Sequence, residues 1–560
     1  MHASRRWFMK RAFIGMAGVT VAGTFILRSS RAGCVPLVQD RAKDDVPAPD
    51  PILRIKDPSA LKDFSGDNFT HAHGILWDKP GYLAKKGGIP APSEQASVVV
   101  IGGGMAGLIA TKELTDLKPI LLEQAPQFGG NSKAETWGNT TYGIGAAYVD
   151  TPEEGSHSFK LLTELGLLKH MRPDGSEEDR MVWNGKVTGE FWKGATDPAR
   201  ADEFKKVWDV LIGINKNSYP NIPPNLPNPA ITQEQFNELD RMSFADWSAK
   251  TFGTLHPHIE EFFREYCWSS FGGTFEEISA AQGLYFLTGD LVQVSVLPGG
   301  NAAIAQALYS KLKSTLPAGH LRSGCFVVDI KTNASGVQIC YETPEGELKT
   351  IQARGCVVAA PKFVARVLIG EMPDDQKDAI SKIKYRAYIV ANVLVNAKPA
   401  SPGYDLFRMT GTPPIHNEVD SKARPYTDMI FGSWAANDHS DHSAFSLYRA
   451  FPYDSGRSDL FKPSAYKDML AEFEAAIPEV LSTANLPADT KIEAIRISRW
   501  GHAVPVGGIG MISDGICERA AASIGSRIFF GQQDNWANPC FETAMNSAIN
   551  AAGAARKALA

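Results

Sequence analysis

The stretch from Ser97 to Leu108 constrains the fold of this chain more than any other. It begins Ser-Val-Val-Val-Ile and runs directly into three glycines, Gly102, Gly104 and Gly107, in the pattern G-x-G-x-x-G. A helical pattern follows at once, and about twenty residues on a second apolar segment ends in Glu123. Strand, glycine loop, helix, strand and acid are in the order that a dinucleotide-binding βαβ unit needs. The sequence therefore predicts a Rossmann-type unit here.

Each glycine of this loop has a physical task. Gly102 allows a tight turn, Gly104 lets the backbone approach a pyrophosphate, and Gly107 lets the helix pack on the strand. The pyrophosphate is expected at the positive end of the helix, and Glu123 is expected to accept hydrogen bonds from a ribose hydroxyl. Neighbouring residues expected at the same site are Met105, Ala106 and Gln124. The loop alone permits NAD, NADP or FAD.

Further small residues follow the acidic strand. Residues 127–132 contain a second glycine pair, and residues 142–148 contain Gly145 and Ala146, which suit close approach of backbone to a ligand. Together with the glycine loop, these segments resemble the flavin-dependent amine oxidase superfamily, which also holds polyamine dehydrogenases, protoporphyrinogen oxidase and phytoene-type desaturases. The resemblance covers roughly residues 96–558, and the segment Pro298–Ala305 is closer to spermidine dehydrogenases than to animal monoamine oxidases.

The C-terminal segment carries the second part of this resemblance. Residues 527–532 form an apolar strand pattern ending in glycine, and a helical pattern runs from about Cys540 to Leu559. In the family, this helix directs its N-terminal N–H groups at the flavin, where reduced flavin holds negative charge. Two residues depart from the family pattern, since Gln532 replaces an acid and Asn131 stands where Arg is usual.

The resemblance implies FAD as the cofactor. Non-covalent binding is expected, because neither Cys517 nor Cys540 has the Gly-Gly-Cys context of a covalent flavin link. The residues expected to bind FAD are Gly102, Gly104, Met105, Ala106, Gly107, Glu123, Gln124, Gly129, Gly130, Asn131, Gly145, Ala146, Val328, Gly531, Gln532, Ala544 and Met545.

The implied fold is α/β, with a Rossmann-type FAD-binding domain and an inserted substrate domain of mixed sheet and helices. The FAD-binding domain is expected to be discontinuous, and the substrate domain to follow a helical lid. The expected segments are 33–94 (extended arm), 95–158, 290–373 and 492–560 (FAD-binding domain), 159–289 (helical lid) and 374–491 (substrate domain).

Residues 1–32 resemble a twin-arginine export signal. Arg5 and Arg6 precede Phe8 and Lys10, and a short, mildly apolar run follows. We expect export by the twin-arginine translocase to the periplasm, with cleavage after Ala32. A transmembrane anchor is the alternative, and lipidation at Cys34 is a further one.

Composition excludes several classes of protein. The net charge of -5 gives no argument for a nucleic-acid partner, and the seven cysteines form neither C-x-x-C nor a haem-attachment motif. No arrangement of residues predicts a metal site.

The family transfers a hydride from a substrate C–H to flavin N5, so orientation and a dry pocket matter more than acid–base groups. Trp500 and His502 are the candidate catalytic residues, one as a pocket wall and one as a hydrogen-bonding group; a core Trp and a structural His are the alternative. Amine oxidases of the family carry a Lys near N5, and the strand register places Ala391 there. The acceptor is either oxygen or, as the missing Lys favours, a quinone or redox protein.

Three functions fit these observations. The first is an exported FAD-dependent amine or polyamine dehydrogenase or oxidase. The second is a desaturase or isomerase of an apolar lipid, and the third is a flavin-binding protein without catalysis. An acidic pocket would favour polyamines, and a long apolar tunnel would favour lipids.

Overall fold

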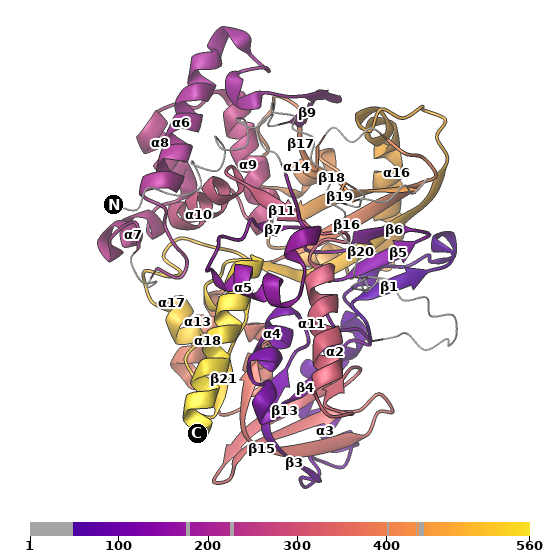
Figure 1. Cartoon of the computed structure of the whole chain (residues 1–560), viewed down its shortest axis with the longest axis vertical. Helices are drawn as coiled ribbons and strands as arrows, with labels where there is room; N and C mark the ends of the chain where they lie inside the picture. Colours follow the sequence, from indigo (N-terminus) through magenta and orange to yellow (C-terminus); the bar gives the residue numbers. More distant parts are fainter. Residues whose placement is uncertain (1–48, 175–179, 225–228, 400–402, 433, 436–441) are drawn as a thin grey trace, which may run out of the picture. The chain divides into compact units, whose positions relative to one another are not determined.

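The computed structural model describes residues 49–174, 180–224, 229–399, 403–432, 434–435 and 442–560 (Figure 1). The predicted export signal and Cys34 lie outside the described residues. None of the described helices has both the length and the apolar character to cross a membrane.

The first large sheet contains the predicted nucleotide-binding strands. Its order is β12-β4-β3-β15-β14-β13, with β21 also paired to β15, and the pairs β12–β4, β4–β3, β3–β15 and β15–β21 are parallel. The three strands predicted before Gly102, before Glu123 and before Gly531 are confirmed within a few residues as β3, β4 and β21. The bounds are β3 Glu94–Ile101, β4 Ile120–Leu122, β12 Leu321–Arg322, β13 Phe326–Asn333, β14 Gly336–Glu342, β15 Leu348–Val358 and β21 Ile528–Phe530.

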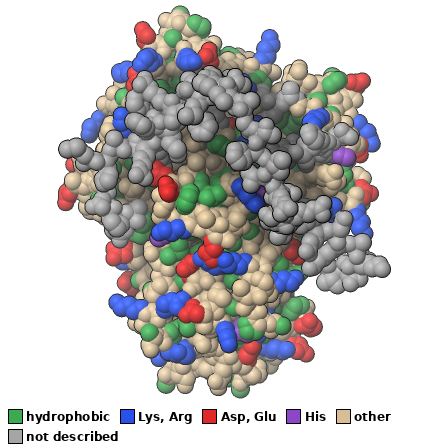
Figure 2. All heavy atoms as spheres, in the orientation of Figure 1, with side chains coloured by type: hydrophobic (Ala, Val, Ile, Leu, Met, Phe, Trp, Pro, Cys, Tyr) green, Lys and Arg blue, Asp and Glu red, His purple; other side chains and the backbone are tan. Residues whose placement is uncertain are grey.

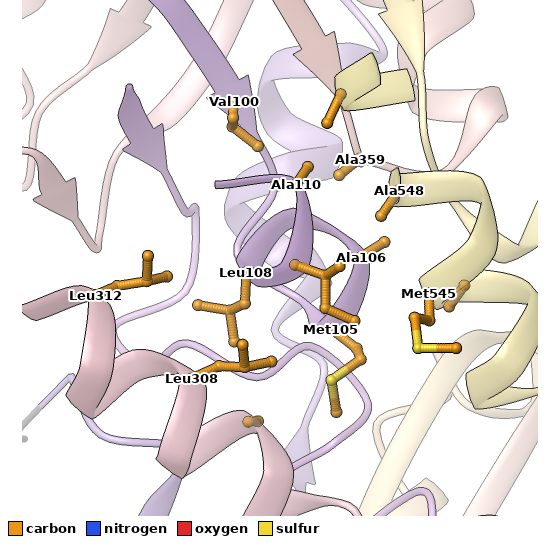
Figure 3. Packing of buried hydrophobic residues seen from close by; sticks show 14 of the residues in the cluster. Val100, Met105, Ala106, Leu108, Ala110, Leu308, Leu312, Ala359, Met545 and Ala548 are labelled. Carbon is orange, nitrogen blue, oxygen red and sulfur yellow. The ribbon is translucent and has the colours of Figure 1, made fainter. Parts of the chain in front are cut away.

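Alternate residues of β3 point to opposite faces of this sheet, because strand side chains alternate. Val98 and Val100 pack with α4 (Met105–Glu113), α11 (Ala302–Thr315) and α18 (Phe541–Leu559). Figure 3 shows this packing, with Leu108 near Leu308 on one side and Met105 near Met545 on the other. The opposite face, with Val99 and Ile101, carries α12 (Lys362–Leu368), α13 (Asp374–Lys382) and α17 (Ile516–Ala520).

The second large sheet has eight strands in the order β10-β9-β17-β18-β19-β16-β20-β2. One face packs on the amphipathic helix α16 (Ala465–Thr483), which the sequence predicted after Ser464. The bounds are β2 Ser65–Gly66, β9 Met181–Trp183, β10 Lys186–Thr188, β16 Tyr385–Val395, β17 Asp405–Met409, β18 Asp428–Phe431, β19 Ser443–Phe451 and β20 Ile492–Pro505.

Helices dominate residues 157–290, as predicted, and those of residues 201–217 and 244–290 lie at the upper left of Figure 1. Thr232 and Gln235 form a capping box, and Phe263 is buried. The segment is not wholly helical, however, because β9 pairs in parallel with β17 of the second sheet. The helices are α5 His157–Glu164, α6 Ala201–Asn217, α7 Gln233–Asp240, α8 Phe244–Phe252, α9 Pro257–Phe271 and α10 Ala280–Asp290.

Two predicted segments need correction. Residues 492–505 were expected in the FAD-binding domain, but β20 pairs with β16 through most of its length and belongs to the second sheet. The part of the predicted arm that the structure describes is not merely extended. It contributes β2 beside β20, and the helices α2 (Phe69–Leu76) and α3 (Lys79–Lys85) beside β13 and β14.

Shorter elements complete the described residues. Two small sheets have the orders β1-β5-β6 and β7-β11-β8. Their strands are β1 Ile52–Ile55, β5 Ala134–Trp137, β6 Thr140–Gly143, β7 Val149–Asp150, β8 Arg172–Pro173 and β11 Val294–Val296, and two more helices are α14 Glu418–Ala423 and α15 Gly456–Asp459. Short 3-10 turns are Pro58–Ala60, Thr115–Leu117, Leu168–His170, Phe191–Lys193, Pro198–Arg200 and Gln533–Asn535. Acidic and basic side chains are interspersed over the described part of the face in Figure 2.

Candidate active site

The glycine loop is closed so tightly that it excludes side chains. A Cβ atom on Gly107 would lie 1.7 Å from the carbonyl oxygen of Gly102, and Gly102 itself has φ +101. Gly104 caps α4, so the first turn of the helix, with Met105 and Ala106, begins directly after the loop. The predicted roles of Gly102 and Gly107 in the turn and in helix packing are therefore visible in the geometry.

The second glycine pair lies against the first loop. Gly129 donates its N–H to the carbonyl of Gly103 at 2.8 Å, and a Cβ on Gly130 would approach the Cα of Gly104 to 2.9 Å. Backbone thus meets backbone with no side chain between, beside the N-terminus of α4. Helix N-termini with open backbone around them suit phosphate groups.

Glu123 ends β4, as predicted. Its Oε2 accepts from the N–H of Gly103 at 2.6 Å and its Oε1 accepts from the N–H of Ala125 at 2.7 Å. The carboxylate is buried, and each oxygen keeps a second lone pair for a ribose hydroxyl. Gln124 is exposed.

The C-terminal end of the site is held by Asp534 rather than by residue 532. Gln532 accepts from the N–H of Asp534 at 2.7 Å, and Asp534 in turn accepts from Lys362 Nζ at 2.6 Å and from Tyr385 Oη at 2.7 Å. Gly531 packs against α18, where a Cβ would meet Ala551 at 2.9 Å. Ala544 and Met545 lie in the first turns of α18 and pack in the cluster that contains α4 (Figure 3).

Val328 occupies a bulge. The pairing of β13 with β14 passes from Val327 to Asp329, so Val328 is skipped in the ladder. A bulge leaves backbone groups unpaired, which suits the predicted backbone contact to adenine. The Val328 side chain packs on Ile75 of α2.

Asn131 joins the glycine pair to the small-residue segment. Its carbonyl accepts from the N–H of Ala146 at 2.9 Å, and a Cβ on Gly145 would lie 2.1 Å from that same oxygen. Its side-chain amide donates to the carbonyl of Ala503 on β20 at 3.0 Å. Asn131 therefore has a structural task here and supplies no positive charge.

Side chains of the second sheet hold the segment 143–147 by its backbone carbonyls. Asn392 donates to Gly143 at 3.1 Å, Trp500 to Ile144 at 2.7 Å, Tyr448 to Gly145, and Tyr404 to Ala147 at 3.2 Å. Sequence reasoning found only Trp500 among these four donors. They fix the segment that the family places beside the flavin ring.

Trp500 and His502 have different surroundings. Trp500 is 3% exposed and belongs to an aromatic cluster with Trp268, Tyr388, Tyr404 and Tyr448, here called the aromatic chamber. His502 stacks instead on Phe363 at 4.0 Å, and burial lowers the pKa of His502 to about 3. His502 is thus neutral, and its predicted role in catalysis stays a prediction.

Buried carboxyls gather around the aromatic chamber. Asp290, at the end of α10, accepts from Tyr148 Oη at 3.0 Å and from Tyr266 Oη at 2.6 Å, and burial raises the pKa of Asp290 to about 7. Asp428 accepts from Ser269 Oγ at 2.8 Å, and burial raises its pKa.

Asp405 is the least satisfied of these carboxyls. Its Oδ1 is fully buried and has no hydrogen-bond partner within the described residues. Burial raises the pKa of Asp405 well above its usual range, and the negative charges of Asp428, Asp174 and Asp290 raise it further. Three acids from three other segments therefore raise the pKa of Asp405, and no cation is among the main influences on Asp290, Asp405 and Asp428.

The position predicted for the family Lys is corrected by the structure. Ala391 points toward α16, in the cluster on the far face of the second sheet. Its neighbours Val390 and Asn392 are on the face of the aromatic chamber, as the cluster of Val390 and the hydrogen bond of Asn392 to Gly143 show. On this face of β16 the described side chains include no lysine.

These residues fit a flavin dinucleotide. The glycine contacts leave room for backbone approach to phosphate, Glu123 ends the ribose-binding strand, and α18 directs its N-terminus toward the same region as α4. Residues 105–554 match the sequence profile of the family described as flavin containing amine oxidoreductase.

The chain belongs to the flavin-containing amine oxidoreductase family. It is an FAD-dependent oxidoreductase. A Serratia protein, Oxidoreductase PigB, is 24% identical over 546 residues, which cover 84% of this chain and 78% of that protein.

Two solved structures share the amine oxidase fold. Cyclohexylamine oxidase from Brevibacterium oxydans matches with a TM-score of 0.60 and 16% identity, over 83% of this chain and 99% of that chain. Putrescine oxidase bound to putrescine matches with a TM-score of 0.57 and 16% identity, over 82% of this chain and 98% of that chain.

Proposed function

We propose that this flavin amine oxidoreductase oxidises a di- or polyamine. The observation that carries the proposal is the group of mutually uncompensated carboxyls at the aromatic chamber, above all Asp405 with its unpartnered oxygen. A neutral ligand would leave these acids as they are, whereas a substrate with several ammonium groups would supply the missing positive charge.

The aromatic chamber has two chemical properties that suit such a substrate. Its aromatic rings offer apolar area to the methylene groups and electron-rich faces to an ammonium group. Its carboxyls, with Asp290 near neutrality, accept hydrogen bonds from a cation and become easier to ionise when one binds. FAD held by the glycine segments would supply the hydride acceptor for the carbon beside the reacting nitrogen, and water would hydrolyse the resulting imine.

The relatives agree with an amine substrate. One structural neighbour is a cyclohexylamine oxidase, and another is a putrescine oxidase in complex with its diamine. The alternative, an apolar lipid, would offer no hydrogen-bond donor to the unpartnered Oδ1 of Asp405.

Anaerobic reduction of the flavin tests the proposal. The yellow protein is mixed with putrescine, spermidine, cyclohexylamine and an apolar polyene, and the flavin absorbance is followed. Bleaching fastest with the di- and polyamines is expected. Bleaching by the polyene alone would make the protein a desaturase, and no bleaching by any donor would make it a flavin-binding protein without this activity.

Two variants connect the result to the carboxyls. Asp405→Asn and Asp290→Asn are expected to raise the apparent Kd of a diamine for the reductive half-reaction by about tenfold or more, because each removes a charged hydrogen bond. Asp489→Asn, at an exposed position, is the matched control and should change nothing. Equal loss with cyclohexylamine in both variants would contradict recognition of a second ammonium.

We also propose that electrons leave to a quinone or redox protein rather than to oxygen. The support is the chamber face of β16, which carries Val390 and Asn392 where the family has Lys. Stopped-flow mixing of the reduced protein with air and with a soluble quinone tests this, and reoxidation by air at the quinone rate would refute it.

Export by the twin-arginine translocase remains our proposal for residues 1–32, with the periplasm as destination. Arg5→Lys with Arg6→Lys should keep the protein with the cytoplasmic fraction in a bacterial host, while the unchanged protein reaches the periplasm. Equal periplasmic amounts of both would refute the proposal, and retention of label from a lipid precursor at Cys34 would show the lipid anchor.

A further inference from the structure

Lys133 is a largely buried side chain whose ammonium has no partner among the described residues. The residue is 8% exposed, and within the described part of the chain its Nζ makes neither a hydrogen bond nor an ion pair. Burial lowers the pKa of Lys133, while the charges of Glu123 and Asp67 act on it from beyond ion-pair distance. An unpaired buried charge is costly, so a position of this kind calls for a counter-charge.

The two nearby carboxylates are already engaged elsewhere. Glu123 accepts the backbone N–H groups of Gly103 and Ala125. Asp67, which the N-terminal arm brings in after β2, accepts from the N–H of Gly501 at 3.0 Å. Neither is bonded to the Lys133 ammonium, so both shape the potential around it without satisfying its three donors.

The stem of Lys133 lies beside the two glycine segments, one with Gly102, Gly104 and Gly107 and the other with Gly129 and Gly130, which are here called the glycine cradle. Its Cγ would be 3.1 Å from a Cβ on Gly129, and Gly129 forms a bridge with Gly104, the N-cap of α4. The side chain therefore starts beside the two glycine segments that leave open backbone for a phosphate group.

Residue 131, where the family usually has Arg, brings no cation to the glycine cradle. Position 131 holds Asn, and its amide is committed to the carbonyl of Ala503 on β20. Lys133 is two residues further along the same segment, and its ammonium is uncommitted. The cradle thus has one full positive charge available from this segment, at 133 and not at 131.

We infer that the Lys133 ammonium binds the diphosphate of FAD. It adds a full charge to the partial charge of the α4 N-terminus, and the diphosphate supplies the counter-charge that the protein lacks. Asp67 limits the net positive charge of the cradle.

Release of FAD from the full-length holoprotein tests this inference. After dilution, the rise of flavin fluorescence gives the dissociation rate at low and at moderate salt. Lys133→Met should release FAD about tenfold to a hundredfold faster and with a weaker dependence on salt, because a charged hydrogen bond to the phosphates is lost. Lys133→Arg should stay within about threefold of the unchanged protein, since Arg keeps the charge.

Three comparisons separate cofactor binding from a structural role. The affinity of the full-length protein freed of FAD for ADP should fall in Lys133→Met, while its affinity for adenosine, which has no phosphate, should not. Asp67→Asn should slow FAD release, and Lys331→Met, at an exposed position on β13, should change nothing.

Release of FAD from Lys133→Met at the unchanged rate would overturn the inference. So would a fall in Tm with normal FAD retention that Asp67→Asn reverses, because Lys133 would then be a counter-ion for protein carboxylates. Both readouts are independent of the donor, so failure of the amine proposal would not affect them.

Discussion

The cofactor end of the site and its substrate end are built in different ways. At the cofactor end, backbone meets backbone: Gly107 lies on Gly102, Gly130 lies on Gly104, and the carboxylate of Glu123 is bonded to two amides. At the substrate end, side chains from separate strands and helices converge, and the Oδ1 of Asp405 lacks a partner within the described residues. The first end is a rigid cradle that admits little change, and the second is a surface that a ligand completes.

This contrast has a consequence for mutations. A substitution at Gly107 or Gly130 acts on the fold itself, because the added Cβ meets backbone that cannot move aside. A substitution in the chamber acts on ligand affinity or on the pH dependence of stability, because side chains there can be replaced by neutral ones of the same shape.

The largest effect is expected for Gly107→Ala. Its Cβ would meet the carbonyl of Gly102 at 1.7 Å, so the protein should be expressed without flavin and largely unfolded. Gly104→Ala is the informative partner, since its Cβ finds nothing closer than 3.5 Å and φ is ordinary. That variant should fold and yet bind FAD more weakly.

Circular dichroism and the flavin content of the purified variants measure both effects. Gly213→Ala, where a Cβ meets nothing within 4 Å, is the control. Equal stability and flavin content of Gly107→Ala and the unchanged protein would contradict the claim that the loop has no room for a Cβ at Gly107.

A smaller effect is expected for Trp500→Phe. The change removes the hydrogen bond to the carbonyl of Ile144 and part of the packing beside Gly145. A buried carbonyl without its donor costs about 1–3 kcal/mol, so Tm should fall by several degrees and anaerobic flavin reduction should slow. Tyr448→Phe removes the adjacent donor to Gly145 and should act in the same direction. Unchanged flavin reduction in both variants would show that the segment 143–147 needs no side-chain support.

The smallest effect near pH 5 is expected for Glu265→Gln, because the carboxyl and the amide are then both neutral in the folded protein. Burial raises the pKa of Glu265 to about 8, although its Oε1 accepts from Arg424 at 2.6 Å. The folded protein keeps a proton that the unfolded chain loses near pH 4.5. The contribution of the protonated Glu265 carboxyl to the free energy of unfolding is therefore complete below about pH 4.5. It is lost as the pH rises to about 8, at roughly 1.4 kcal/mol per pH unit.

Thermal unfolding at pH 5.5 and pH 8 measures this difference. The amide of Glu265→Gln cannot ionise, so the fall in Tm between the two pH values should be smaller than in the unchanged protein. Glu238→Gln, at an exposed position, should keep the original pH dependence. An identical fall in Glu265→Gln would show that Glu265 ionises normally.

Several errors of the sequence analysis have specific physical causes. Ala391 was one residue out of phase, and in a strand a slip of one residue turns every side chain to the other face. Strand β20 was assigned to the wrong sheet, because an alternating pattern predicts a strand without naming its partner. The helices of the arm did leave local signs, since Asn68 and Asp78 cap them and Pro80 follows the second cap.

The sequence by itself determined the cofactor end. Glycine spacing, an acid at a strand end and a small-residue helix are local features, and each limits backbone geometry wherever it occurs. Only the tertiary structure decided the substrate end. Asp174, Asp290, Asp405 and Asp428 are far apart in the chain and belong to no common motif, so their mutual influence arises from the burial and proximity that folding creates.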